Sequence, residues 1–382
     1  MKRFFLLTLA SAALLGASAA PVKTYEVKSP DGRLALVLTA GERLSFTVAR
    51  DGETLVAPSE MALTLSTGEV LGESPRVRSA RRRAVTETID APLYRQSRFD
   101  AAYNELDLRL RGDYGILARA YDDGVCYRFY TERDGELTIV DETAQLNFEG
   151  DPSAYIPYSK TEIPMRTSFE NTYEYAPLSK FRTQTVAFMP VLVDLGERGY
   201  VLYTESDVEA YPGVYLTYDK EAKGFAARFA ECPTETSLTK RFQDVVERSA
   251  DYIARVDGRR SYPWRIVAYA ATATELPVND MVWQTAEASR VADASWVRDG
   301  KIAWDWWNNW GVYGVDFKSG INTETYKYFI DFAAANGIEY VALDEGWGVR
   351  DGDVMHVVPE IDLPEIVSYA REKKVGIILW VV

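Results

Sequence analysis

Hydrophobic residues follow two different periods along this chain. From about residue 24 to residue 270, apolar residues alternate with polar ones, as at Leu106, Leu108 and Leu110. A period of two is typical of strands with one buried face. Turn residues such as Asp51 and Gly52 separate the runs. The pattern predicts a large antiparallel β-sandwich over residues 21–278. Its expected strands include residues 34–38, 44–48, 125–130, 185–193, 200–204 and 264–270.

The pattern changes after residue 278. Residues 279–300 are expected to form a connector. A strand at about 302–306, a strand at 338–344 and a strand at 376–382 then alternate with two helical segments. Strands that alternate with helices and read as nearly continuous apolar runs predict a parallel sheet with crossover connections.

The two helices carry clear end signals. Asn322 is the expected N-cap of the first, and Gly337 ends it in a left-handed conformation. Asp362 begins the second, and Glu365 three residues later completes a capping box. The residues expected on the buried helix faces are Tyr326, Phe329, Ile330, Ala333 and Ala334, followed by Leu363, Ile366, Val367 and Ala370.

A closed barrel is favoured over an open doubly wound sheet. Aromatic and acidic residues follow the first two strands, at the end where barrel enzymes keep their sites. No glycine-rich phosphate loop follows the first strand. Because a (β/α)8 barrel takes about 250 residues, residues 301–382 are expected to hold its first three strands in a C-terminally truncated chain.

Tryptophans and carboxylates gather at those two strand ends. Tryptophan presents both an apolar face, which suits the C–H face of a sugar ring, and a polar N–H. Carboxylates accept hydrogen bonds from sugar hydroxyls. In a continuous strand Trp304 and Trp306 would share one face and Trp307 would oppose them, so at least one of the cluster (which includes Trp310) should pack in the core. The carboxylates act in catalysis, hold substrate hydroxyls or cap helix amides. The candidate substrate-binding residues are Trp304, Asp305, Trp306, Trp307, Asp344, Glu345 and Trp347.

The N-terminus and the net charge narrow the partners. Residues 1–20 combine Lys2 and Arg3 with an apolar stretch and small residues, which predicts a cleaved signal peptide rather than a membrane anchor. The mature protein is therefore expected to be exported, periplasmic or extracellular, without membrane insertion. A formal net charge of −14 disfavours nucleic acid and anionic membranes and tolerates neutral sugars and divalent cations.

Other candidate chemistry is sparse. His356 is the only histidine, so a histidine-rich zinc site or a serine triad would rest on it alone, and a solvated loop residue is the simpler interpretation. Cys126 and Cys232 either pair or serve as small buried hydrophobes. Glu170 and Asn171, in a polar aromatic segment at 168–175, offer oxygen atoms suited to calcium.

Several motifs resemble glycoside hydrolase family 97. Within the barrel segment these are WDWWN at 304–308, FKSGINTETY at 317–326, LDEGW at 343–347, PEID at 359–362 and ILW at 378–380. The first domain adds SPDG at 29–32, YNEL at 103–106 and IPY at 156–158. The likeness covers essentially the whole mature chain.

This resemblance implies a β-supersandwich, a (β/α)8 barrel and exo-acting α-glucosidases or α-galactosidases that depend on calcium. It implies that Glu170 is a calcium ligand and that the general acid and the base or nucleophile lie downstream of Val382. The complete protein is then expected to release terminal α-linked glucose or galactose from oligosaccharides, and this 382-residue chain alone is expected to be inactive and to aggregate through its last apolar strand. The alternative is a non-catalytic carbohydrate-binding protein or an inactive fragment. The anomeric outcome and the oligomeric state stay open.

Overall fold

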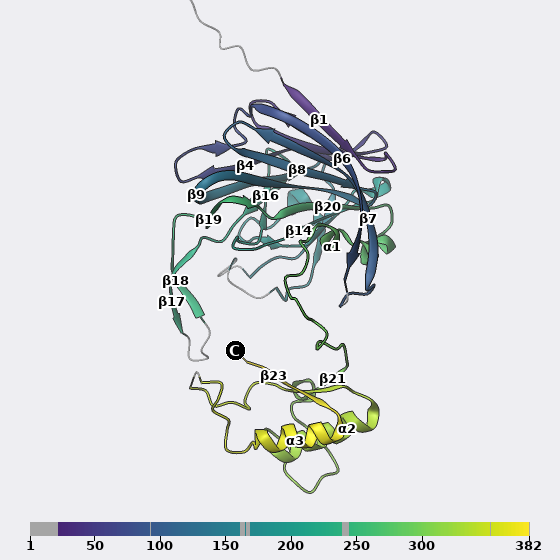
Figure 1. Ribbon diagram of the computed structural model, residues 1–382, viewed down its shortest axis with the longest axis vertical. Coiled ribbons are helices and arrows are strands. Elements are labelled where there is room, and N and C mark those ends of the chain that lie inside the picture. Colours follow the sequence, from purple (N-terminus) through teal and green to yellow (C-terminus); the bar gives the residue numbers. More distant parts are fainter. Residues whose placement is uncertain are drawn as a thin grey trace, which may run out of the picture. The chain divides into compact units, whose positions relative to one another are not determined.

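The chain contains two compact units, one of residues up to 232 together with 250–287, and one of residues 233–249 together with 288–382. The computed structural model describes residues 22–91, 93–160, 165, 169–238, 244–351 and 353–381 (Figure 1). The predicted signal peptide at 1–20 lies outside these residues. No helix among them is long and apolar enough to span a membrane. Each unit is described by itself.

The first unit consists of antiparallel strands with a few short helical turns. Its longest strand, β9, pairs with β4, β8, β16, β19 and β20 and so joins the sheet together. The helical turns are η1 (Leu178–Lys180), η2 (Gly196–Arg198), η3 (Ala273–Val278) and α1 (Met281–Thr285). The strands are β1 (Lys23–Lys28), β2 (Leu34–Ala40), β3 (Leu44–Arg50), β4 (Glu53–Leu65), β5 (Val70–Leu71), β6 (Val77–Asp90), β7 (Arg98–Leu110), β8 (Tyr114–Tyr121), β9 (Gly124–Asn147), β10 (Ser153–Ile156), β11 (Glu174–Pro177), β12 (Ala187–Phe188), β13 (Val191–Asp194), β14 (Tyr200–Ser206), β15 (Tyr215–Asp219), β16 (Gly224–Arg228), β19 (Ala254–Ser261) and β20 (Trp264–Ala270).

Alternating burial explains why these segments form strands. Leu34, Leu36 and Leu38 of β2 are fully buried in the main core, while the residues between them are partly exposed. Asp51 and Gly52 both adopt positive φ angles in the turn between β3 and β4, as the sequence indicates. The prediction of a mostly β first region is therefore confirmed. The predicted run at 185–193 is divided into β12 and β13 at Pro190, which has no N–H to donate to a neighbouring strand.

The second unit contains a parallel sheet of β21 (Ile302–Trp304), β22 (Tyr340–Leu343) and β23 (Gly376–Leu379). Helix α2 (Thr323–Asn336) connects the first two strands, and α3 (Leu363–Lys373) connects the last two. A separate hairpin of β17 (Pro233–Leu238) and β18 (Asp244–Ser249) is exposed along most of its length.

The predicted helix ends are confirmed. The Asn322 side chain accepts a hydrogen bond from the Thr325 amide, and Gly337 has a φ of 64°. The Asp362 side chain accepts from the Glu365 amide. Glu365 does not return a bond to Asp362 in the part of the chain that the structure describes; its carboxylate pairs with Lys327 instead.

Two details of the second unit differ from the expectation. The first strand ends at Trp304 rather than at 306, because Asp305 begins a 3-10 turn, η4 (Asp305–Asn308), that the Trp310 amide closes by donating to the Asp305 carbonyl. Ala334 and Val367 are exposed, so the buried faces of α2 and α3 are narrower than predicted. The sheet and the helices are packed together by Tyr326, Ile330, Ala333, Val341, Leu343, Ile366 and Ala370.

Candidate functional site

Two neighbouring strand ends of the parallel sheet carry most of the predicted site residues. Trp304, the last residue of β21, lies in register with Ala342 of β22. Asp305 directly follows β21, and Asp344 directly follows β22. Since parallel strands end at the same edge of a sheet, the two carboxylates come together there.

Asp305 holds the two strand ends in place. Its side chain is fully buried, and its Oδ2 accepts a 2.7 Å hydrogen bond from the Tyr326 hydroxyl. The Asp344 amide donates to both oxygens of Asp305 at 3.2 to 3.3 Å. Burial raises the pKa of Asp305, although these hydrogen bonds favour the charged form and oppose the shift. Asp305 therefore ties the end of β21 to α2 and to the end of β22.

Asp344 is also engaged by the protein. Its Oδ2 accepts a 2.6 Å hydrogen bond from the Trp304 indole N–H, and its Oδ1 accepts one of the same length from the Glu345 amide. Glu345 forms an ion pair with Arg350. With its side chain one-third exposed, Glu345 is the most open of the three carboxylates. It is thus the carboxylate best placed to meet a sugar hydroxyl.

The tryptophans form an exposed aromatic surface. Trp304 and Trp307 stack with ring centres 6.2 Å apart and an interplanar angle of 27°. Trp307 is 82% exposed and Trp304 is 42% exposed, so the pair offers apolar faces to solvent. Trp306 is also exposed and meets the edge of Trp310. Such a surface can accept the apolar face of a sugar ring.

The arrangement of these rings corrects one prediction. Trp307 does not oppose Trp304 across a strand, because the strand has already ended and the η4 turn brings the two rings to the same side. Trp310 packs against the hydrophobic core of the unit, which confirms that one of the cluster has a packing role.

Trp347 lies away from this aromatic surface. It is 5% exposed, belongs to the core, and donates a 2.7 Å hydrogen bond from its indole N–H to the carbonyl of Trp380. The preceding Gly346 has a φ of 113°, and a Cβ there would collide with Ile321. In the described residues Trp347 therefore joins the segment after β23 to the end of β22, and most of its ring is covered by the core.

The backbone at the end of the tryptophan cluster, at Asn309 and Trp310, has an uncommon conformation. Asn309 and Trp310 are consecutive residues with φ of 53° each. Asparagine tolerates the left-handed region, but a bulky residue there is strained. The Trp310 amide donates to the Asp305 carbonyl and the Asn308 side chain donates to the Gly311 carbonyl, so hydrogen bonds hold the turn on both sides. Strain of this kind gathers where a protein positions functional groups.

The predicted metal ligand Glu170 lies in the first unit. It is exposed and follows residues 166–168, which fall outside the described part. Among the described residues, no three His, Cys, Asp or Glu side chains gather as a metal site. Glu170 can supply one carboxylate, and these residues do not fit a calcium ion without further ligands.

The remaining candidates have structural surroundings. His356 is exposed, and its Nδ1 lies 2.7 Å from Asp351 Oδ2, in agreement with a solvated loop histidine. Cys126 is a free thiol buried in a small core with Trp264, which supports its interpretation as a small hydrophobe.

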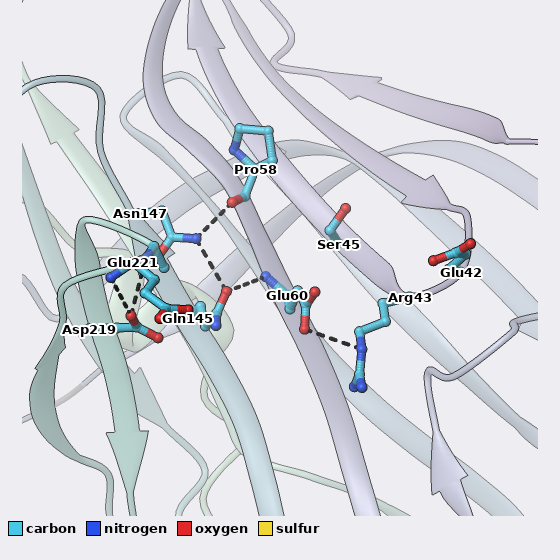
Figure 2. Close-up of a pocket in the computed structure, with 10 residues that line it drawn as sticks. Glu42, Arg43, Ser45, Pro58, Glu60, Gln145, Asn147, Asp219 and Glu221 are labelled. Atoms are coloured by element: carbon cyan, nitrogen blue, oxygen red, sulfur yellow. Dashed lines mark hydrogen bonds and ion pairs between the residues drawn. The ribbon is translucent and has the colours of Figure 1, made fainter.

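The first unit contains a polar hollow of 520 Å³, which the sequence did not indicate. Figure 2 shows that its polar groups bind one another: Gln145 Oε1 accepts from the Glu60 amide and from Asn147, and Arg43 pairs with Glu60. It lacks the exposed aromatic face of the strand-end cluster. Its lining residues are Glu42, Arg43, Ser45, Pro58, Glu60, Gln145, Asn147, Asp219, Glu221 and Ala222.

Sequence reasoning missed the polar roles of Tyr326 and Arg350. Tyr326 was expected on an apolar helix face, and it is fully buried there. Its hydroxyl also donates a hydrogen bond to the buried Asp305 carboxylate. A tyrosine rather than a phenylalanine at a buried position is a signal of such a partner. Arg350 follows Glu345 in an irregular loop, and no period indicates that the two side chains meet.

Comparisons with known proteins identify the family of the chain. Residues 27–287 match the family model described as Glycosyl-hydrolase 97 N-terminal, and residues 306–382 match Glycoside hydrolase 97. The chain is 42% identical over 367 residues to the retaining alpha-galactosidase of Bacteroides thetaiotaomicron, covering 94% of this chain and 55% of that protein. It is 30% identical over 366 residues to a probable retaining alpha-galactosidase of Streptomyces bingchenggensis, covering 92% of this chain and 51% of that one.

Solved structures share the fold. A glycoside hydrolase family 97 enzyme from Pseudoalteromonas sp. strain K8, in complex with acarbose, has a TM-score of 0.76 at 19% identity over 92% of this chain and 53% of its own. A beta-arabinopyranosidase has a TM-score of 0.73 at 22% identity over 93% of this chain and 55% of its own. The chain thus spans about half the length of the relatives it matches. With both family models matched over most of its length, the chain belongs to glycoside hydrolase family 97.

Proposed function

We propose that the complete protein is a retaining α-glycoside hydrolase that releases terminal α-linked galactose, or glucose, from oligosaccharides. The observation that carries the proposal is the exposed Trp304–Trp307 stack at the strand ends, with Trp304 fixed by its hydrogen bond to Asp344. The 42% identity to a protein named retaining alpha-galactosidase favours galactose over glucose.

In this proposal the first unit is a β-supersandwich and the second unit contains the first three strands of a (β/α)8 barrel. Retention needs two carboxyl groups about 5 to 5.5 Å apart. Asp305 is buried and Asp344 accepts from two donors, so neither has the open position of such a group. The family resemblance assigns the general acid and the nucleophile to later barrel strands. The residues described here hold the substrate.

The proposed contribution of these residues is binding and orientation. The Trp304–Trp307 faces stack on the sugar ring and exclude water from one side of it. Glu345, paired with Arg350, accepts a hydrogen bond from a sugar hydroxyl. Asp305 and Asp344 fix the indole and the Glu345 backbone, so that less freedom is lost when the sugar binds.

We propose Glu170 as the one calcium ligand within this chain. Its carboxylate is the one group of the 168–175 segment that the family resemblance assigns to the metal, and the described residues add no complete ligand set. If bound, calcium would supply a fixed positive charge beside the substrate. Export, periplasmic or extracellular, likewise rests on residues 1–20.

The test is hydrolysis of p-nitrophenyl α-galactoside and α-glucoside by the complete protein with calcium present. We expect release of the sugar with retained anomeric configuration, read by proton NMR. No hydrolysis of either substrate would contradict the proposal. Oligosaccharide binding without hydrolysis would favour the alternative of a carbohydrate-binding protein.

The variant Trp307→Ala tests the role of the aromatic surface. Because Trp307 is 82% exposed, its removal should leave folding intact and raise KM about tenfold, equivalent to about 1.4 kcal/mol of binding, with little change in kcat. Trp296→Ala is the matched control, since Trp296 is 75% exposed and lies outside the cluster. Equal KM values for the two variants would contradict the assignment of Trp307 to the substrate site.

A further inference from the structure

A hollow lined by arginines lies on one face of the first unit, outside the strand-end site. Its volume is 540 Å³, within the usual range for small-molecule sites. Five arginines and two acids line it, in a chain whose net charge is −14. We call it the arginine hollow; its lining residues are Arg81, Arg82, Arg83, Glu105, Asp107, Leu117, Arg119 and Arg128.

Strand register explains how these residues meet. Arg81 of β6 pairs with Asp107 of β7, Asp107 pairs with Leu117 of β8, and Leu117 pairs with Arg128 of β9. The four therefore form one row across four strands, and directly paired side chains point to the same face of a sheet. The outer two, Arg81 and Arg128, lie about 14 Å apart at the backbone, given three strand spacings. Leu117 forms an apolar floor between them.

Both acids of the hollow are already engaged. Glu105 is buried and accepts from Arg83 at 2.6 Å and from Arg119 at 2.9 Å. Asp107 accepts a 2.6 Å hydrogen bond from the Tyr130 hydroxyl and pairs with Arg109. Within the described ranges, neither acid forms a side-chain hydrogen bond or ion pair with Arg81 or Arg128. The positive charge of the outer arginines is therefore not neutralised inside the hollow.

Arg128 is the more buried of the two outer arginines. Its side chain is 11% exposed, and its guanidinium lies 4.4 Å from the centre of the Trp264 ring. Its Nη1 forms long ion pairs with Asp207 at 3.4 Å and Glu287 at 3.7 Å, which do not line the hollow. Its buried Nε has no acceptor in the described structure. Burial and the nearby charge of Arg119, which stacks on the same indole, lower the pKa of Arg128. An anion beside it would relieve both effects.

Arg81 supplies a second, more accessible cation. Its side chain is exposed and has no hydrogen bond or ion pair with any described residue, whereas the side chain of the adjacent Arg82 donates to the Glu26 carbonyl. Guanidinium groups bind carboxylates through paired N–H donors, which gives orientation as well as attraction.

From this arrangement we propose that the arginine hollow binds a small organic carboxylate, such as an acidic sugar, between Arg81 and Arg128 over Leu117. This site belongs to the β unit alone and does not depend on the hydrolase activity proposed above. The volume accommodates a molecule of monosaccharide size, and Leu117 contacts its apolar part.

The test is isothermal titration calorimetry of the complete protein with D-galacturonate, using D-galactose as the neutral twin. We expect saturable binding of galacturonate that strong salt weakens. A galactose signal belongs to the hydrolase site proposed above and should be the same in the parent and in Arg81→Gln. Arg81→Gln and Arg128→Gln should each weaken binding about tenfold or more. The matched control is Arg259→Gln, because Arg259 is exposed and pairs with Asp134 elsewhere on the same unit.

Two variants are needed to separate a loss of binding from a loss of folding. Arg128→Gln removes a group stacked on Trp264 and can perturb folding, whereas Arg81→Gln changes an exposed side chain and should fold as the parent does. Absence of galacturonate binding, or binding that Arg81→Gln and Arg128→Gln leave unchanged, would overturn the proposal. Inorganic sulfate that binds as tightly as galacturonate would overturn the assignment to an organic carboxylate.

Discussion

The two units of this chain treat buried charge in different ways. In the β unit, Arg265 is 1% exposed and is enclosed by Glu142 and Glu205, with Tyr211 donating a further hydrogen bond to Glu142. In the α/β unit, the fully buried Asp305 meets no cation in the described residues; it is held by a tyrosine hydroxyl and a backbone amide.

This difference distinguishes a buried charge cluster that stabilises the fold from a polar network that supports a binding site. The Arg265 cluster is almost completely enclosed, with side-chain exposures of 1% for Arg265, 3% for Glu142 and 12% for Glu205, so its charges bind one another within the fold. The Asp305 network reaches the protein surface. Asp344, which donates its amide to Asp305, also accepts hydrogen bonds from the Trp304 indole and from the amide of the partly exposed Glu345. A polar network that ends at exposed aromatic faces is what a binding site requires.

The largest expected effect is the loss of Arg265. Arg265→Leu leaves two buried carboxylates without their cation and should lower the free energy of unfolding of the β unit by about 3 to 5 kcal/mol. Chemical denaturation followed by far-UV circular dichroism reports mainly on this strand-rich unit. Arg259→Leu is the control: its ion pair with Asp134 is exposed, and we expect a loss below about 1 kcal/mol. Similar losses in the two variants would contradict a special role for the buried cluster.

A smaller effect is expected in the α/β unit. Asp305→Leu leaves the Tyr326 hydroxyl and the Asp344 amide without their acceptor, which should destabilise this unit by about 2 to 4 kcal/mol. Seven of the nine tryptophans lie in this unit, so tryptophan emission follows its unfolding. Tyr326→Phe should have a smaller effect, because the Asp344 amide keeps its bond. A change in the circular dichroism transition of the β unit in either variant would show that the networks are not separate.

Local signals in the sequence predicted the elements and their ends. The turn at Asp51 and Gly52, the Asn322 cap and the end of α2 at Gly337 each depend on a few adjacent residues, and the structure confirms them. The aromatic and acidic cluster was also found from sequence, because strand ends follow from the alternation of strands and helices.

Long-range contacts could not be predicted in the same way. The strand at 302–306 was too long because the turn at Asp305 depends on Asp344, 39 residues away. The role of Trp347 depends on the Trp380 carbonyl, 33 residues away. The arginine hollow requires the register of four strands, and no single stretch of sequence contains it.

A partly buried carboxyl of the β unit, Asp123, should make the stability of this unit depend on pH. Burial, reinforced by the charges of Asp280 and Asp122, raises the pKa of Asp123 from 3.8 to about 6. The stabilising contribution of its protonated form is therefore complete below pH 3.8 and is lost as the pH rises through about 6. We expect about 2 kcal/mol of unfolding free energy to disappear between pH 4 and pH 7 relative to Asp123→Asn. Parallel pH profiles for parent and variant would contradict the raised pKa.

The smallest effect lies at the surface of the α/β unit, where His356 contacts Asp351 and, more distantly, Asp353. The Asp351 hydrogen bond raises the pKa of His356 above 6.5, so the contribution of the charged pair is complete below pH 6.5 and is lost as the pH rises through the raised value. Because His356 is the only histidine, one imidazole NMR signal reports its titration. Asp351→Asn should move the midpoint down more than Asp353→Asn, since Asp351 lies at 2.7 Å and Asp353 at 3.6 Å. A midpoint that neither variant changes would contradict the pairing. Unlike the titration of Asp123, that of His356 should leave the unfolding transition almost unmoved, because water screens an exposed pair.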